Sequence, residues 1–416
     1  MMYTQSDDRI RVAVVGGGAA GMMAAGTAQS LGASVTLYEG MGRLGKKLAI
    51  TGKGRCNVTN NCKPDEFLSN ITKNARFFYG AINAFTPEDT MSFFEGLGVS
   101  LKTERGNRVF PVSDKAKDIV DAMRSYCNGV NIIYKKVSAV EKGENGFSVT
   151  ADGDCRTFDK VIIATGGRSY PLTGSDGFGY KLASRLGHTV TAISPSLIPI
   201  ESSSRLCRDM QGLSLKNVSI KVKDKSGKVL YTDFGEMMFT HFGVTGPMIL
   251  SASAHIKDMD ISSLTLSIDL KPALDEKTLD QRLLSDFSKN SNKDLINALG
   301  ELLPSKMIAP FIEYTGLDER KKVNSITKDE RRKLLLGLKS LDIPLSRLRP
   351  IDEAIITSGG VSTKELNPKS MESKIHHGLF FAGEIIDLDA YTGGFNLQIA
   401  FSSGYLAGKF AAEYEY

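Results

Sequence analysis

The chain has 416 residues, of which 41% are hydrophobic and 24% are charged, as in an ordinary globular protein. This length predicts two or three domains, and the formal net charge of +5 is too small to indicate a nucleic-acid partner. The polar N-terminus and the lack of an apolar run of about 20 residues predict no signal peptide and no membrane partner. The five cysteines are scattered without the spacing of a zinc site, so we expect a cytoplasmic protein with no bound metal.

A glycine-rich turn near the N-terminus is the most informative feature of the chain. Residues 12–15 have the apolar, β-branched pattern of a buried parallel strand, and Gly16, Gly18 and Gly21 follow it as G-x-G-x-x-G. Such glycines make a tight turn and let a pyrophosphate approach the start of the next helix. A second strand ends at Glu39, where a carboxylate can accept hydrogen bonds from ribose hydroxyls. This arrangement predicts a site for an adenine dinucleotide.

Residues 40–60 are rich in glycine, lysine and arginine and show too little apolar periodicity for a helix or a strand. We expect a long ordered loop that follows the dinucleotide. Further on, the pattern predicts helices at 75–84, 88–97 and 116–127, then a β-meander formed by strands at 131–134, 137–142 and 146–151. A strand over 160–164 then leads into Thr165 and Gly166.

The middle of the chain reads as an insertion. Residues 194–269 show short alternating stretches typical of strands, residues 272–341 are helical and rich in charge, and parallel-sheet signals resume at 353–357 and 378–382. We therefore predict the class α/β, with a discontinuous FAD-binding Rossmann domain and an inserted β-rich plus helical domain. The predicted boundaries are 1–195 and 342–416 for the FAD-binding domain, 196–271 for the inserted β-rich domain and 272–341 for the inserted helical domain.

A second glycine motif lies near the C-terminus. A strand over 379–382 runs into Gly383 and Glu384, and Gly393 and Gly394 then open the last helix. The amide N–H groups at such a helix start carry partial positive charge. In a flavin fold they would point at the ring and stabilise the anionic, reduced flavin.

Together these segments resemble one family over nearly the whole chain: the bacterial BaiN/RdsA-type NAD(P)/FAD-dependent oxidoreductases, which include aminoacetone oxidases and a bile-acid reductase. The resemblance rests on R-L-G-K-K-L-x-I-T-G-K-G-R-C-N-V-T-N (43–60), R-S-Y-P-x-x-G-S-D-G-x-G-Y (168–180), F-T-H-F-G-V-T-G-P (239–247), R-P-x-x-E-A (349–354), T-S-G-G-V (357–361) and the M-E-S-K to F-S-S-G stretch (371–404). It implies non-covalent FAD, a glutathione-reductase-like FAD domain and a three-part architecture. It does not fix the substrate.

The resemblance also implies a set of cofactor contacts. Gly16, Gly18, Ala19, Ala20 and Gly21 would hold the pyrophosphate and Glu39 the ribose, with Arg43 and Lys47 beside them. Val137 would meet the adenine through its backbone, and Thr165 and Gly166 would pass behind the dinucleotide. Asn57 would lie near the ring, Gly383 and Glu384 would approach the ribityl chain and phosphate, and Gly394, Asn396 and Leu397 would cap the flavin. Glu384 replaces the Asp that is more usual at this place in the wider fold.

Because flavin performs the hydride step, the protein needs to supply position and a proton donor or acceptor. We expect His241, Tyr170 and Tyr391 as candidates, although a structural role for His241 fits its motif equally well. Arg55 would hold either a substrate anion or an FAD phosphate. Cys56 has no C-x-x-C partner and is expected to be a small buried thiol.

The predicted function is an FAD-dependent oxidoreductase that acts on a small organic substrate. No second G-x-G-x-x-G follows a strand, so NAD(P)H would bind only transiently as electron donor. The alternatives are an O₂-dependent oxidase of small amines, a non-catalytic flavin-binding regulator, and a flavoprotein that modifies nucleic acid. The last would need a broad basic face, and residues 271–350 carry only a modest excess of basic residues. The sequence leaves the oligomeric state open.

Overall fold

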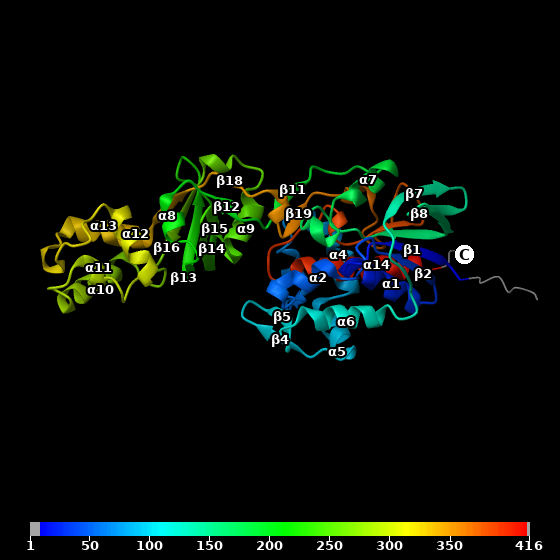
Figure 1. The fold of residues 1–416 in the computed structure, drawn as a ribbon, viewed down its shortest axis with the longest axis horizontal. Helices are drawn as coiled ribbons and strands as arrows, with labels where there is room; N and C mark the ends of the chain where they lie inside the picture. Colours follow the sequence, from blue (N-terminus) through cyan, green and yellow to red (C-terminus); the bar gives the residue numbers. More distant parts are fainter. Residues whose placement is uncertain (1–8, 414–416) are drawn as a thin grey trace, which may run out of the picture. The chain divides into compact units, whose positions relative to one another are not determined.

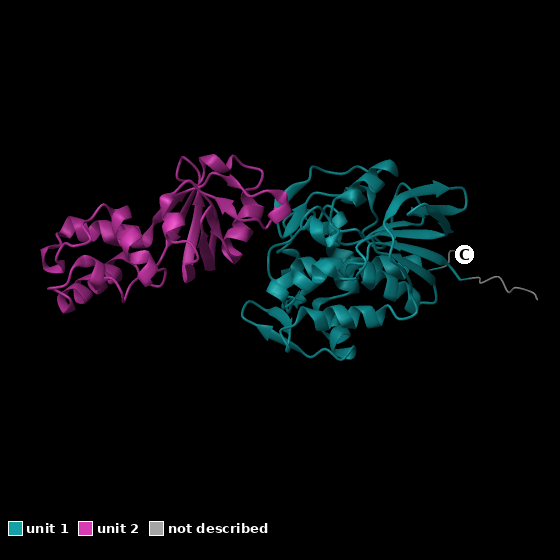
Figure 2. Ribbon diagram, viewed as in Figure 1, with its two compact units in different colours: residues 1–195, 354–416 teal, residues 196–353 magenta. Residues whose placement is uncertain are grey.

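The computed structural model describes residues 9–413, which divide into two compact units (Figure 2). Unit 1 consists of the chain up to Pro195 and from Ala354 onward, and unit 2 is Ser196–Glu353. Each unit has its own cluster of buried hydrophobic residues, so the insertion has a core of its own. No helix within residues 9–413 is long and apolar enough to cross a membrane.

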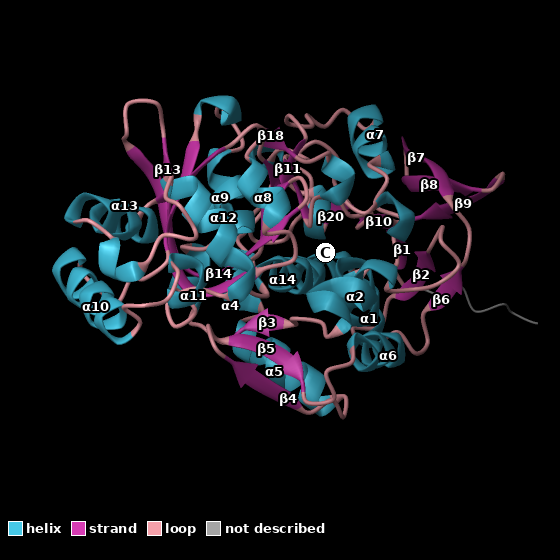
Figure 3. Cartoon of the chain, turned by 60° about the vertical axis from the view of Figure 1, so that its left-hand side comes forward, coloured by secondary structure: helices cyan, strands magenta, loops and turns pink. Residues whose placement is uncertain are grey.

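Unit 1 is built on a five-stranded parallel sheet with the strand order β20-β10-β1-β2-β6 (Figure 3). The central strand pairs Val12 with Val35 on one side and with Lys160 on the other. All four apolar residues of β1 are buried, as expected of a strand covered on both faces. The strands are β1 (Arg11–Val15), β2 (Ser34–Tyr38), β6 (Asn131–Ile133), β10 (Lys160–Ile163) and β20 (Leu379–Phe381).

Helices and three smaller sheets complete unit 1. The first and last helices pack against each other beside the parallel sheet. The helices are α1 (Ala19–Ser30), α2 (Lys46–Ile50), α3 (Pro64–Leu68), α4 (Ala75–Ala84), α5 (Pro87–Gly96), α6 (Ala116–Tyr126), α7 (Phe178–Arg185) and α14 (Phe395–Ala411). The smaller sheets are β3 (Thr59–Asn60) with β5 (Arg108–Pro111) and β4 (Leu101–Glu104), the meander β7 (Val137–Gly143), β8 (Gly146–Ala151) and β9 (Asp154–Phe158), and β11 (Ser194–Ser196) with β19 (Ile356–Ser358).

Unit 2 contains a seven-stranded antiparallel sheet with the order β17-β16-β13-β14-β15-β12-β18 (Figure 1). Its strands are β12 (Ile200–Glu201), β13 (Ser214–Lys223), β14 (Val229–Thr240), β15 (Gly243–Thr245), β16 (Thr265–Asp269), β17 (Leu341–Pro344) and β18 (Arg347–Leu348). Its helices are α8 (Arg205–Asp209), α9 (Pro247–Ile256), α10 (Glu276–Lys289), α11 (Leu295–Ala298), α12 (Ser305–Thr315) and α13 (Lys328–Lys339).

The α/β class with an inserted antiparallel part is confirmed, and four local predictions need correction. Residues 131–133 join the parallel sheet as β6 instead of the meander, whose third strand is β9. Residues 356–358 pair with β11 and not with the parallel sheet. The expected loop at 40–60 contains the short helix α2. The inserted unit ends at Glu353 instead of 341, because β17 and β18 return to its sheet.

Candidate functional site

The surrounding protein leaves no room for a side chain at two of the three glycines after β1, but it does at the third. Gly16 has φ of 109°, and a Cβ there would lie 2.5 Å from the carbonyl oxygen of Ala164. A Cβ at Gly21 would overlap the carbonyl oxygen of Gly16. Gly18 has an ordinary φ of −82°, and a Cβ there would meet no atom within 4 Å. The fold therefore requires Gly16 and Gly21, whereas Gly18 leaves open space beside the helix start.

The start of α1 faces this open space without a capping side chain. The N-cap residue is Gly18, and no side chain accepts a hydrogen bond from the amides of the first turn. The N–H groups of Ala19, Ala20 and Gly21 are thus the exposed donors of the helix start. With the positive end of the helix dipole, they form an anion site that fits a pyrophosphate.

Glu39 lies at the end of β2, next to the same turn. Its carboxylate accepts hydrogen bonds from the amide of Gly17 at 2.9 Å and from the amide of Met41 at 2.6 Å. These bonds fix the carboxylate beside the glycine turn and use only part of the acceptor capacity of its two oxygens. This geometry suits the ribose role that the sequence predicts for Glu39.

The last helix, α14, also begins without a side-chain cap. Its N-cap Gly394 has φ of 99°, and a Cβ there would overlap the carbonyl of Thr59. The side-chain amide of Asn396 accepts from Ala390 N at 2.9 Å and donates to Ala390 O at 2.8 Å. The side chain of Asn396 therefore fastens the preceding loop, and the backbone N–H groups of Asn396 and Leu397 are the donors that remain for a ligand.

Close packing sets the distance between the two helix starts. A Cβ at Gly404 would lie 2.5 Å from the carbonyl oxygen of Ala20, and one at Gly408 would overlap that of Ala24. From the first contact to the second, the residue number rises by four in each helix, so the two helices run in the same direction. Gly404 comes nine residues after the start of α14, and Ala20 comes one residue after the start of α1. At 1.5 Å per residue, this difference of eight residues places the start of α14 roughly 12 Å before the start of α1. The two uncapped helix starts thus lie on adjacent helices and are offset along them, as the predicted phosphate and ring contacts would require.

A partly buried polar cluster contains two of the predicted cofactor contacts, Lys47 and Glu384. The ammonium of Lys47 is 2.5 Å from Glu384 Oε2 and 2.7 Å from Ser169 Oγ. Glu384 Oε1 accepts from Ser169 Oγ at 2.9 Å and from the amide of Thr357 at 2.8 Å. The Thr357 hydroxyl oxygen in turn accepts from the amides of Arg168 and Ser169. The cluster joins α2, the loop after β10, β19 and the Gly383-Glu384 turn, so Lys47 and Glu384 are brought together as predicted partners of one site.

Ser169 and Thr357 are the functional residues that sequence reasoning missed. Both stand inside the R-S-Y-P and T-S-G-G-V motifs, yet neither has a side chain that suggests cofactor chemistry on its own. Their role is to hold the loop that carries Tyr170. That loop keeps Tyr170 at φ 55°, a conformation that costs a non-glycine residue about 1–3 kcal/mol and that occurs mostly at functional sites.

Four buried side-chain oxygens have no hydrogen-bond partner among the described residues. Thr90 Oγ1 and Tyr180 Oη are two of them, and the other two, Asn57 Oδ1 and Thr165 Oγ1, belong to residues predicted to contact the cofactor. An unpartnered buried polar atom costs free energy, so each of the latter two oxygens fits a place where a ligand supplies the missing bond. Val137 is buried at the start of the edge strand β7, and Gly166 has φ of 72° directly after Thr165. Arg43 is exposed on the segment before α2.

The four candidates for chemistry lie in different surroundings. Tyr170 and Tyr391 belong to unit 1, and the Tyr170 ring lies 6.0 Å from the Lys47 ammonium. His241 belongs to unit 2, where it is exposed in the turn between β14 and β15, with its ring 5.0 Å from that of Phe242. Arg55 is held by ion pairs to Glu104 and Asp114.

The ion pairs of Arg55 bear on its predicted role. Its guanidinium lies 4.2 Å from the Phe110 ring, and its hydrogen bond holds the pKa of Glu104 below the usual value. Hydrogen bonds from Lys102 and then from Arg55 lower the pKa of Asp114. A substrate anion at Arg55 would have to compete with these two carboxylates. Cys56 is fully buried and forms no disulfide, and burial raises the pKa of its thiol to about 12. This confirms the small buried thiol expected there, which is inert as a nucleophile.

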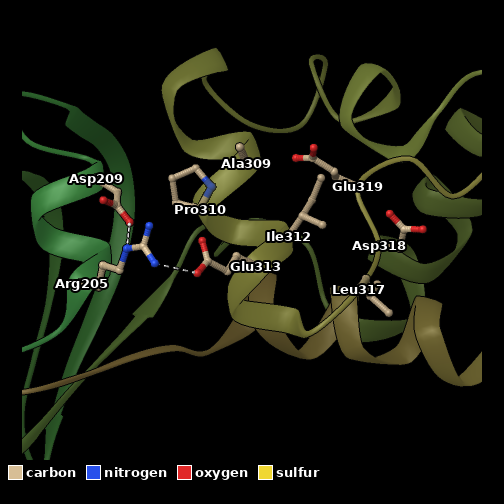
Figure 4. Close-up of a pocket in the computed structure, with 9 residues that line it drawn as sticks. All are labelled: Arg205, Asp209, Ala309, Pro310, Ile312, Glu313, Leu317, Asp318 and Glu319. Carbon is tan, nitrogen blue, oxygen red and sulfur yellow. Dashed lines mark hydrogen bonds and ion pairs between the residues drawn. The ribbon is translucent and has the colours of Figure 1, made fainter.

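A surface hollow in unit 2 is separate from this site (Figure 4). It lies between α8 and α12, where Arg205 bridges Asp209 and Glu313 at 3.3 Å each. These side chains are largely exposed, as in an ordinary surface ion pair. Within residues 9–413, no group of three or more His, Cys, Asp and Glu side chains is placed to hold a metal ion.

Unit 1 thus provides what a flavin adenine dinucleotide requires: an open phosphate cradle, a carboxylate at the ribose position and a second helix end for the ring. The protein belongs to the class of FAD-dependent oxidoreductases. More closely, it is a member of the HI0933-like family, because the model for the HI0933-like protein Rossmann domain matches residues 10–410.

Two relatives match over nearly their whole length. The chain is 30% identical to a 3-dehydro-bile acid delta(4,6)-reductase of Clostridium scindens, over 97% of this chain and 99% of that protein. It is 29% identical to a ribosomal RNA dihydrouridine synthase of Escherichia coli, over 97% and 98%. Among solved structures, a 3-ketosteroid delta1-dehydrogenase of Sterolibacterium denitrificans has the same fold, with a TM-score of 0.53, 13% identity and coverage of 96% and 99%.

Proposed function

We propose that the protein uses NAD(P)H to reduce a carbon–carbon double bond conjugated to a carbonyl group in a small organic substrate. One hydride and one proton add across the double bond, and NAD(P)H becomes NAD(P)⁺. The overall reaction balances with one proton from solvent.

The observation that carries this proposal is the reaction shared by two relatives with unlike substrates. By its name, the Clostridium scindens protein reduces the delta-4,6 double bonds of a 3-dehydro bile acid. The Escherichia coli protein makes dihydrouridine, which is uridine saturated at a double bond conjugated to a ring carbonyl. Both double bonds are electron-poor at the carbon remote from the carbonyl, which is where a hydride adds. We therefore expect a third member of the family to use the same chemistry.

FAD supplies the hydride chemistry when it is bound. The chain's own residues hold it and manage charge and protons. The N–H groups at the start of α1 bind phosphates, and those of Asn396 and Leu397 stabilise negative charge near the start of α14. Tyr170, Tyr391 and His241 are the proposed proton donors to the substrate carbon next to the carbonyl. The cluster of Lys47, Glu384 and Ser169 keeps the Tyr170 loop in position.

A uracil base in RNA is the second candidate substrate. The Escherichia coli relative is nearly as similar to this chain as the bile-acid reductase, over the same share of its length. Uracil offers the same conjugated double bond, so one site chemistry serves both candidates. The expectation of no nucleic-acid partner therefore stays a prediction that a binding experiment has to test.

Product analysis under anaerobic conditions tests the proposed function. The FAD-loaded protein is incubated with NADH or NADPH and either a 3-oxo-4-ene steroid, cyclohexenone or a uridine oligonucleotide, and the products are analysed by mass spectrometry. We expect a saturated product with two added hydrogens, formed in step with NAD(P)H oxidation. Peroxide release with small amines in air, without any such product, would favour the amine-oxidase alternative. A flavin that no donor reduces would favour a non-catalytic regulator.

A further inference from the structure

The small sheet of β3, β5 and β4 lies next to the start of α14 (Figure 3). Its register pairs Arg108 with Asn60 on one side and with Glu104 on the other. Antiparallel partners share a face of the sheet, with their Cβ atoms about 5 Å apart. The side-chain amide of Asn60 donates to Gly106 O and to Gly393 O at 3.0 Å each. Arg108 therefore lies on the sheet face from which Asn60 reaches the loop that opens α14.

The protein uses only part of the hydrogen-bonding capacity of Arg108. Its Nε donates to the carbonyl oxygen of Arg105 at 3.0 Å, and its Cζ lies 5.9 Å from the centre of the Phe110 ring. Within residues 9–413, Arg108 forms no ion pair and donates no second hydrogen bond. The two terminal nitrogens of a guanidinium can hold a carboxylate or a phosphate through paired hydrogen bonds. In Arg108 these nitrogens have no partner within the described part of the chain, and the side chain is only partly buried.

The other charged groups around this face are paired with one another. Arg55 makes hydrogen bonds to Glu104 and to Asp114. Lys102 lies 2.8 Å from Asp114 Oδ2. Hydrogen bonds from Arg55 make the largest contribution to the low pKa of Glu104, and the charge of Arg108 makes the smallest. An anion at Arg55 would have to displace two carboxylates, so the anion-binding role predicted for Arg55 fits Arg108 better.

The position of Arg108 indicates which anion it would meet. Gly393 directly precedes the N-cap of α14, the helix start that we assign to the flavin ring, and Tyr391 lies two residues earlier. The start of α1, which we assign to the FAD phosphates, lies roughly 12 Å further along the packed helices. An anion at Arg108 would therefore belong to a molecule that reacts at the ring, and not to FAD itself.

We propose that Arg108 binds an anionic group of a molecule that reacts at the ring end of the site. This group is a phosphate of NAD(P)H or a carboxylate of the substrate, and both match the paired donors of a guanidinium. The inference rests on the proposed function, because it requires a second molecule beside the flavin.

Binding to the oxidised, FAD-loaded protein tests this inference without turnover. The probes are NADP⁺, a 3-oxo-4-ene steroid with a side-chain carboxylate, and the methyl ester of that steroid, and calorimetry gives each Kd. We expect Arg108→Gln to raise the Kd of NADP⁺ or of the steroid carboxylate about 10-fold or more. The probe that is affected identifies the source of the anion. The methyl ester lacks the charge and should bind the natural chain and the variant alike.

Two further variants show whether the guanidinium itself is needed. Arg108→Lys should weaken the same probe less than Arg108→Gln, because it keeps the charge but loses the paired donors. Lys102→Gln is the matched control, since it removes one positive charge from the same sheet face, and it should leave every Kd unchanged. The absorbance of bound flavin per protein shows whether each variant retains FAD.

Four results would overturn the proposal. The first is that neither anionic probe binds the natural chain, and the second is that Arg108→Gln changes neither Kd. Equal weakening by Lys102→Gln would indicate general charge attraction, and loss of FAD in both Arg108 variants would assign the residue to the cofactor site. Cyclohexenone, which carries no anion, is mixed in parallel with the dithionite-reduced natural chain. Its reduction tests the proposed function alone, so a failure of one proposal is distinguishable from a failure of the other.

Discussion

Two helices of unit 2 and two helices of unit 1 begin in opposite ways. In unit 2, Asp275 caps α10 through the amide of Thr278 at 2.7 Å, and Thr327 caps α13 in a capping box with Glu330. In unit 1, α1 and α14 begin at Gly18 and Gly394, which have no side chain to offer.

This difference shows which parts of the chain are shaped by stability and which by a ligand. A capping side chain contributes about 1 kcal/mol, so a helix start without one gives up stability unless another group uses its amides. The open space at Gly18 lies at the uncapped start of α1. The starts of α1 and α14 therefore keep donors for the cofactor, whereas α10 and α13 of unit 2, like α5 of unit 1, are completed by their own side chains.

Removal of unit 2 should have the largest effect, and it tests whether the FAD contacts lie in unit 1 alone. A shortened chain in which a short linker joins Pro195 to Ala354 should keep FAD and lose turnover completely, because all the proposed FAD contacts lie in unit 1. The absorbance of bound flavin per protein and the rate of product formation are the measurements. A soluble, folded and colourless shortened chain would contradict the division. If the shortened chain is insoluble, the intact protein is cleaved at the two junctions between the units, and the flavin absorbance is measured in the same way.

The glycine turn gives the next largest effect. Gly18→Val should raise the Kd of FAD at least about 100-fold without unfolding the chain, since its side chain enters the space that the pyrophosphate needs. Gly21→Ala should instead prevent folding, because its Cβ would overlap the carbonyl of Gly16. Circular dichroism and flavin absorbance separate the two outcomes. Gly96→Val is the control, as a Cβ there also meets no atom within 4 Å. A yellow Gly18→Val protein would contradict the ligand role.

His241→Ala tests whether unit 2 takes part in the chemistry. If His241 transfers a proton, the variant should retain FAD and slow turnover by about 100-fold or more. His255→Ala, also an exposed histidine of unit 2, should leave turnover unchanged. Near-normal kcat in the His241→Ala variant would assign this residue to structure and leave Tyr170 and Tyr391 as the candidates.

Acid unfolding of unit 2 gives the smallest effect. Lys321 at 2.6 Å and the amide of Thr327 hold the pKa of Glu330 at about 2. Because this folded-state pKa lies below the unfolded value of about 4.3, the stabilisation is present above that value and is lost as the pH falls toward 2. The stability difference between the natural chain and Glu330→Gln should therefore shrink from pH 5 to pH 2 in urea titrations. Glu319→Gln should show no such trend, and an equal trend would contradict the assignment.

The predicted cofactor site rests on local spacing. The glycines at 16–21, Glu39 and the pair at 393–394 each act within a few residues of their own strand or helix, so their pattern is visible in the sequence. The α/β class follows from the same strand–helix alternation.

Pairing between distant segments was not predictable in the same way. The strand at 131–133 has a pattern that suits a meander, yet its partner is β2, nearly a hundred residues earlier. Arg55 is bound by Glu104 and Asp114, which no local spacing connects to it. The return of β17 and β18 to the inserted sheet moved the domain boundary for the same reason.

Stopped-flow absorbance tests the central claim most directly. The FAD-loaded protein is reduced anaerobically with one equivalent of NAD(P)H and mixed with a 3-oxo-4-ene steroid, cyclohexenone or a uridine oligonucleotide. We predict that at least one of these conjugated double bonds restores the oxidised flavin band near ~450 nm, with one saturated product formed per flavin. A reduced flavin that reacts with O₂ but with none of these double bonds would contradict the proposed function.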